Sequence, residues 1–158
     1  MFALIFGVAG AGCINPLASK TGYIEVIADP MSKAVIESAI RDLESASEES
    51  FLHDSTSEYS ITVKFAKLSQ GELGLTMYGD DENCPILLDE SMNPKIGIFT
   101  YSDLASVAIH EIGHCFGLDH SNDKNDVMYF EYLPEQTSIE SFRRFVYQIN
   151  YSRVRNVP

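Results

Sequence analysis

Three histidines and one glutamate are spaced so that they could hold and use a metal ion. Residues 110–120 read His-Glu-Ile-Gly-His-Cys-Phe-Gly-Leu-Asp-His. On a helix, residues four apart lie on one face, so His110 and His114 can reach the same ion. His120 lies about 15 Å further along a helix axis than His110, so it can join them only if the chain turns back.

Gly117 allows that turn, because glycine adopts the left-handed conformation that ends many helices. Three nitrogen ligands leave one position of a zinc ion open to water, whereas a structural site is closed by a fourth side chain. The ion would acidify that water and polarise a carbonyl oxygen, and Glu111 would act as general base and pass the proton to the leaving amine. The segment therefore predicts one catalytic Zn²⁺ ion. A chance match to the short H-E-x-x-H pattern is disfavoured by the glycine and the third histidine.

The helix that carries these histidines needs supporting elements, which the rest of the chain predicts. An apolar run over residues 104–109 leads into His110 at helical spacing. Residues 138–150 have an apolar face and are expected to form a helix beneath the metal helix. The other expected elements are a helix over residues 31–47 and strands over residues 23–28, 59–68, 73–78 and 85–89.

Residues 110–121 resemble the metzincin zinc endopeptidases, and most closely the matrixins, which have serine directly after the third histidine. The sequence Val-Met-Tyr at 127–129 stands where these families have a methionine turn. The resemblance implies that Met128 is an apolar floor beneath the imidazoles, although an ordinary core methionine would fit as well. It also implies an α+β, zincin-like fold: a twisted mixed sheet with an upper-subdomain helix, a zinc-ligand helix, the Met-turn and a C-terminal helix.

The resemblance also implies a place for a peptide substrate. Residues 71–76, which include Leu73 and Gly74, resemble the matrixin edge strand that pairs with substrate. An exposed strand edge offers free N–H and C=O groups to an extended peptide. A glycine-rich turn into an ordinary strand is the alternative.

Three further residues are expected around the pocket for the residue after the cleaved bond. Phe130 and Tyr132 stand where matrixins form its outer wall, but Phe130 replaces the usual proline. In related branches a tyrosine at the place of Phe130 reaches the zinc, so no such ligand is expected here. Ser106 would lie near the inner end, where a small side chain favours a deep pocket.

Composition indicates one acidic domain. The chain has 158 residues, 45% of them hydrophobic, which suits a single core. Its formal charge of -12 argues against nucleic acid as a partner, because the phosphates would be repelled. We expect a protein or peptide substrate, a monomer and no membrane span; the acidity is explained by solubility or by a preference for basic substrates.

Residues 1–13 form an apolar run followed by small residues, the shape of a secretory signal. Cys13 after Ala11-Gly12 also resembles the attachment site of a lipoprotein. We therefore interpret residues 1–18 as a signal peptide or lipoprotein leader and residues 19–158 as the catalytic domain. A buried N-terminal strand is the alternative.

Two cysteines and one acidic loop leave alternatives open. An oxidising compartment permits a bridge between Cys84 and Cys115, yet Cys115 is equally well explained as a small buried residue. Structural Ca²⁺ could bind the adjacent acids Asp80, Asp81 and Glu82, but no clear calcium motif supports it. Matrixins also have a second, structural zinc site, and this chain lacks the histidines that bind it there.

These features predict an exported zinc metalloendopeptidase, secreted, periplasmic or at the cell surface, with a lipid anchor at Cys13 as one form of attachment. The alternative is a matrixin-fold binding or structural protein that holds zinc without significant proteolysis. The intact Glu111 argues against that alternative, because loss of the base is the simplest way to disable such a site.

Overall fold

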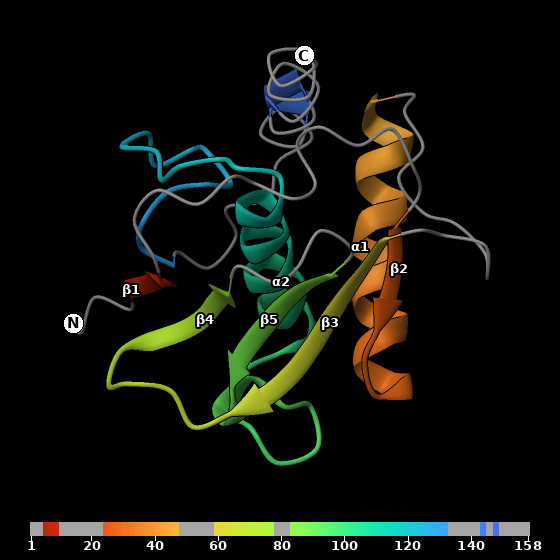
Figure 1. The fold of residues 1–158 in the computed structure, drawn as a ribbon, viewed down its shortest axis with the longest axis vertical. Helices are drawn as coiled ribbons and strands as arrows, with labels where there is room; N and C mark the ends of the chain where they lie inside the picture. The colour runs from red at the N-terminus through yellow and green to blue at the C-terminus, as the bar shows by residue number, and fades with distance from the viewer. Residues whose placement is uncertain are drawn as a thin grey trace.

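A mixed sheet of five strands carries two long helices (Figure 1). The computed structural model describes residues 5–9, 24–47, 59–77, 83–132, 143–144 and 147–148. Its strands are β1 (Ile5–Ala9), β2 (Ile24–Ile27), β3 (Tyr59–Ala66), β4 (Glu72–Met77) and β5 (Asn83–Asp89). The helices are α1 (Pro30–Ser47), the short 3-10 helix η1 (Glu90–Met92) and α2 (Tyr101–Cys115).

The strand order is β1-β4-β5-β3-β2, with β4 antiparallel to β5 and the other neighbours parallel. Parallel strands need a crossover connection, and α1 lies in the one between β2 and β3. The α+β fold and mixed sheet expected from the sequence are thereby confirmed. The predicted bounds of α1 and of strands β2 to β5 agree with the structure within two residues. The predicted helix over residues 138–150 lies mostly outside the described residues, although 143–144 and 147–148 are helical.

The core lies between the helices and one face of the sheet. Along β5, Cys84, Ile86 and Leu88 are buried and alternate with partly exposed residues, as a strand with one covered face requires. The helices pack against each other, α1 also against β2, and α2 against β4 and β5. Helix α2 is buried from Val107 to its end, so two of the three residues predicted to bind metal, His110 and His114, lie inside the molecule.

The sequence predicted that β4 has an exposed edge, and this prediction is wrong for the chain that includes residues 5–9. Strand β1 pairs with β4 in parallel, with Ile5 opposite Glu72 and Ala9 opposite Met77. An unpaired edge offers free backbone groups, and the apolar N-terminal segment is rich in residues that suit a strand. Of the alternatives for this segment, the structure shows a strand at residues 5–9. The leader over residues 1–18 stays a prediction.

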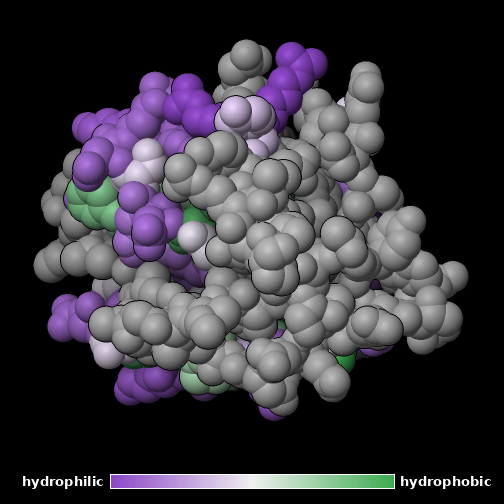
Figure 2. Space-filling view, turned by 45° about the horizontal axis from the view of Figure 1, so that its top comes forward, coloured by the Kyte–Doolittle hydropathy of each residue, from purple (hydrophilic) through white to green (hydrophobic). Residues whose placement is uncertain are grey.

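Hydrophilic side chains dominate the described residues visible in Figure 2, in keeping with the net charge of -12. Among the described residues, no helix has the length and apolar character needed to cross a bilayer.

Candidate metal centre and active site

Three histidine rings converge where α2 ends. The Nε2 atom of His114 lies 3.2 Å from Nε2 of His110 and 3.2 Å from Nε2 of His120. One nitrogen from each ring lies within 4.8 Å of the other two. His110 and His114 are buried, whereas His120 is exposed. The structure therefore brings the three predicted ligands together with one side open.

The turn after α2 explains how His120 reaches the other two rings. Gly117 has a φ of 80°, in the left-handed region. Its N–H donates to the carbonyl of His114 at 2.9 Å, and the Leu118 N–H donates to the carbonyl of Gly113 at 3.0 Å. These two bonds form a Schellman motif, which ends the helix and reverses the chain. The turn at Gly117 is as the sequence predicted.

Two backbone carbonyls fix the tautomers of the buried histidines. Nδ1 of His110 lies 2.8 Å from the carbonyl oxygen of Val127, and Nδ1 of His114 lies 2.7 Å from that of Leu118. A carbonyl oxygen only accepts, so each Nδ1 carries the proton and donates it. The Nε2 atom of each neutral ring then presents its lone pair to the centre, as a metal ligand must.

Burial keeps these rings neutral. It lowers the pKa of His110 well below its usual value, and the neighbouring His114 adds to this. It also lowers the pKa of His114 to about 4 and, to a smaller extent, the pKa of His120. Neutral imidazole is the form that binds metal, so the cluster is ready for a cation near neutral pH.

The donor set fits a zinc ion. Zn–N bonds of about 2.0–2.1 Å in a tetrahedron place the nitrogens about 3.3–3.4 Å apart, close to the 3.2 Å separations found here. The unprotonated Nε2 atoms of His110 and His114 cannot donate to each other, so a shared cation suits their 3.2 Å separation. Among the described residues, no fourth histidine, cysteine or acid joins the cluster. Such a set is typical of a catalytic site rather than a closed structural one.

Glu111 directly follows His110 on α2, and its side chain contacts β4. Its side chain is fully buried, and Thr76 Oγ1 lies 2.6 Å from its Oε2. Among the described residues its Oε1 has no hydrogen-bond partner, and it lies close to the backbone of Gly74. Burial raises the pKa of Glu111 to about 8, against the hydrogen bonds from Thr76. A divalent cation at the histidines would oppose that rise, because an adjacent positive charge favours the carboxylate.

Replacing His120 with alanine is expected to weaken zinc binding by about 100-fold or more, since even the loss of a residue that only orients a ligand costs about 10- to 100-fold. The metal content per chain after dialysis measures this. His53→Ala is the matched control, because His53 is the one histidine outside the motif. An unchanged zinc content in the His120 variant would show that this residue is not a ligand.

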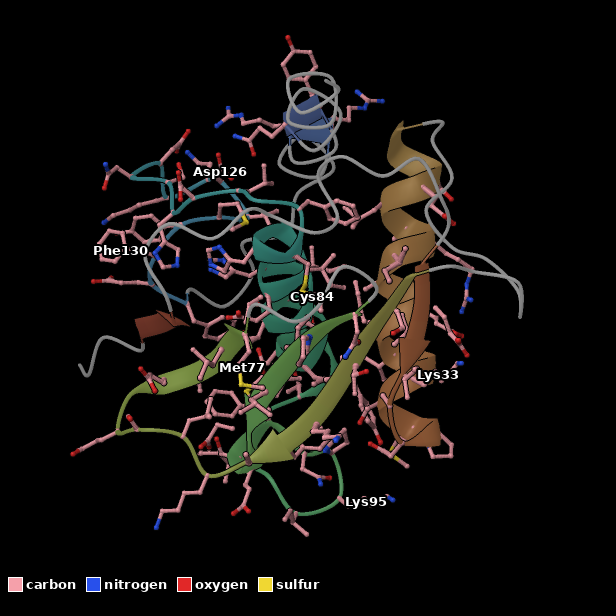
Figure 3. All side chains as sticks on the ribbon, in the orientation of Figure 1. Lys33, Met77, Cys84, Lys95, Asp126 and Phe130 are labelled. Atoms are coloured by element: carbon pink, nitrogen blue, oxygen red, sulfur yellow. A yellow bond between two sulfur atoms is a disulfide. The ribbon has the colours of Figure 1, made fainter. Side chains whose placement is uncertain are left out.

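The predicted methionine turn is tied to the metal segment. Met128 is buried, its N–H donates to Oδ1 of Asp126 at 2.9 Å, and its carbonyl accepts from the Ser121 N–H at 2.7 Å. Because Ser121 follows His120, this bond fixes the chain beside the third ligand. Asp126, labelled in Figure 3, is a buried acid that sequence reasoning missed. The sequence feature that could have identified it is an acidic residue two positions before Met128.

The expected wall residues pack against aromatic neighbours. Tyr132 is buried, its ring meets that of Phe99 edge to face at 6.3 Å, and its hydroxyl donates to Oδ1 of Asp103. Phe130 packs on Tyr129 with ring centroids 4.6 Å apart. Asp103 also completes a capping box at the start of α2, so Tyr132 is joined to the first turn of the metal helix. The role of Phe130 and Tyr132 in binding substrate stays a prediction.

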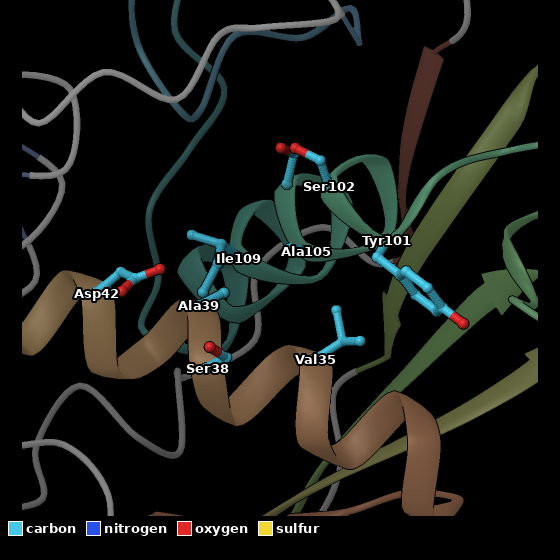
Figure 4. A pocket seen from close by; sticks show the side chains of 9 residues that line it. Val35, Ser38, Ala39, Asp42, Tyr101, Ser102, Ala105 and Ile109 are labelled. Carbon is cyan, nitrogen blue, oxygen red and sulfur yellow. The ribbon is translucent and has the colours of Figure 1, made fainter.

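The other predicted substrate residues lie on two different elements. Leu73 is buried in the core, and Gly74 contacts the side chain of Glu111. Ser106 lines a hollow between α1 and α2, to which α1 contributes Val35 and α2 contributes Ile109 (Figure 4). A role for Ser106 in the substrate pocket also stays a prediction.

A disulfide between Cys84 and Cys115 joins β5 to the end of α2 (Figure 3). Both residues are buried. Cys115 directly follows His114, one of the predicted metal ligands, so the bond holds this end of the helix against the sheet. The sequence left this pairing open, and in the structure the two cysteines form a disulfide.

Comparison with known proteins agrees with this geometry. The model of the matrixin peptidase family matches residues 21–143, which is most of the chain and includes the three histidines and Met128. No curated protein matches the chain. The protein is a member of the matrixin family of zinc metallopeptidases.

Proposed function

We propose that this chain is an exported zinc endopeptidase that hydrolyses protein or peptide substrates with Glu111 as general base. The observation that carries the proposal is the arrangement around α2, which brings three imidazoles within 4.8 Å of one another and carries the buried Glu111 directly after the first of them. An intact site of this kind favours catalysis over a binding or structural role that needs the metal alone.

The residues have separate roles in the proposed reaction. His110, His114 and His120 hold the ion, and the carbonyls of Val127 and Leu118 orient the two buried rings. When bound, zinc supplies Lewis acidity, which polarises the scissile carbonyl and acidifies water.

Glu111 moves the proton in this scheme. Its Oε1 accepts the proton from water and then delivers it to the amine that leaves as the peptide bond breaks. Its burial excludes bulk water from this transfer, which strengthens the electrostatic interactions in the site.

Two features support export. A disulfide persists in oxidising compartments, and the Cys84–Cys115 bond is buried in the core. The apolar residues 1–13 suit a signal peptide or lipoprotein leader. We propose that residues 1–18 are removed, with lipid attachment at Cys13 as the alternative form, and that the mature domain is secreted, periplasmic or at the cell surface.

Purified residues 19–158 are expected to cleave an unstructured protein such as casein, and a zinc chelator should stop the reaction. Cleavage is measured by the release of acid-soluble peptides, with and without added zinc after chelation. The chain 1–158 is expected to cleave more slowly, because β1 occupies the edge of β4 that an extended substrate would use.

The outcomes separate the two parts of this proposal. No cleavage by residues 19–158, despite one bound zinc per chain, would contradict a general endopeptidase. Equal rates for 19–158 and 1–158 would contradict the use of the β4 edge by substrate.

A further inference from the structure

Glu111 has one side-chain partner among the described residues, the hydroxyl of Thr76 on β4. Thr76 Oγ1 lies 2.6 Å from Oε2 of Glu111 and 2.9 Å from the carbonyl oxygen of the same residue. Thr76 is 1% exposed and Glu111 is 0% exposed, so water does not compete for the single hydroxyl proton, which lies closer to Oε2 than to the carbonyl oxygen. A hydroxyl next to a buried carboxylate forms a charge-assisted hydrogen bond, which is among the stronger ones in proteins.

The hydroxyl distinguishes the two oxygens of the carboxylate. Oε2 accepts from Thr76, whereas Oε1 has no hydrogen-bond partner in the part of the chain that the structure describes. A hydrogen bond to one oxygen limits rotation of the carboxylate, so Oε1 keeps its place close to the backbone of Gly74. This is the atom to which we assigned the proton transfer.

Gly74 restricts Glu111 from the same strand. A Cβ atom at position 74 would lie 2.5 Å from Oε1, 2.7 Å from Cγ and 2.8 Å from Cδ of Glu111. The side chain therefore rests directly on the backbone of β4, in space that only glycine leaves open. Close packing limits the places that the carboxylate can occupy, and the bond to Thr76 selects the orientation among them.

We infer that Thr76 is a positioning residue for Glu111, which holds Oε2 so that Oε1 remains the free atom of the general base. The inference rests on the proposed function, and it assigns part of the catalytic geometry to β4 rather than to the metal helix. A role for the hydroxyl in stability alone is the competing explanation, because the same hydroxyl also reaches the main chain of α2.

Thr76→Val removes the hydroxyl at nearly constant volume and is expected to lower kcat by about 10- to 100-fold, the scale of a small misplacement of a catalytic group. KM should change by no more than about twofold, because ground-state binding does not use Glu111. Zinc should stay at one ion per chain. Thr76→Ser keeps the hydroxyl and should restore kcat to within about threefold of the parent.

Thr62→Val is the matched control. Its hydroxyl also makes a side-chain hydrogen bond, to Asn83 at 2.9 Å, but on β3 and without contact to Glu111. If the Thr76 hydroxyl had only a structural role, Thr76→Val and Thr62→Val would have similar effects on kcat. Thr76→Ser would then not selectively restore kcat. A kcat for Thr76→Val within about twofold of the parent, or one that serine does not restore, would overturn the inference. If valine prevents folding, Thr76→Ala replaces it in the comparison with serine.

Urea unfolding of the metal-free protein tests the contact without any activity. Thr76→Val should lower the unfolding midpoint when Glu111 is present and lower it less in a Glu111→Ala background, because the bonded pair is already broken there. Equal shifts in both backgrounds would overturn the inference, even if the parent cleaved no substrate. A parent that cleaves casein while Glu111→Ala does not would uphold the proposed function, whatever the result at Thr76.

Discussion

Glu111→Ala is expected to lower peptide hydrolysis by about a thousandfold or more while zinc stays bound, because general base catalysis contributes about 10²- to 10⁴-fold. The three imidazoles that would hold the metal do not depend on the carboxylate, since the carbonyls of Val127 and Leu118 orient the two buried rings. The measurement is kcat/KM on a casein-derived peptide beside the zinc content of the same sample.

Glu90→Ala serves as the control for this variant. It removes an exposed carboxylate in η1 and leaves the metal helix unchanged. If Glu111→Ala kept its activity with full zinc, Glu111 would not be the base and the proposed mechanism would be wrong. If it lost zinc as well, the carboxylate would have a structural role in the metal site that the hydrogen bonds do not indicate.

Local sequence was sufficient to predict the convergence of the histidines. The spacing of His110 and His114 is a property of one helix, and the turn at Gly117 needs only a residue that accepts a φ of 80°. The bounds of α1 and of strands β2 to β5 were also predictable, because periodic burial marks them without knowledge of their partners.

Contacts that depend on the register between distant elements could not be predicted. The bond from Thr76 to Glu111 joins residues 35 apart in sequence and requires a particular alignment of β4 with α2. Alternation along β4 could have suggested that Thr76 points inward, but not which group it meets. The same holds for β1, whose pairing with β4 depends on a long-range register that the apolar composition of residues 1–13 does not specify.

The contact that holds Tyr132, one of the expected residues of the pocket wall, could not be predicted from the sequence either. The resemblance to matrixins placed this residue in the substrate pocket, but not its hydrogen bond to Asp103. No role was predicted for Asp103 from the sequence. Its two oxygens serve the helix cap and Tyr132 separately, and that double use follows from the three-dimensional position of the segment after the Met-turn.

The Cys84→Ala/Cys115→Ala variant is expected to lose about 3 to 4 kcal/mol of unfolding free energy, from the closure of a loop of this length. The two cysteines are 31 residues apart in sequence, and the loop between them includes the start of the metal helix. Domains of this size are stabilised by about 5–15 kcal/mol, so the loss would remove a large part of the total. Urea unfolding, followed by circular dichroism, measures it.

Cys13→Ala in the chain 1–158 is the control, because it removes a cysteine that is not part of the bond. Reducing agent should lower the unfolding midpoint of the parent and of Cys13→Ala to that of the double variant, and it should leave the double variant unchanged. Since Cys115 follows His114, the double variant should also release zinc faster as the end of α2 loosens. The difference in midpoint is converted to a free energy with the denaturant slope. A double variant within about 0.5 kcal/mol of the parent would mean that core packing alone holds α2 on the sheet.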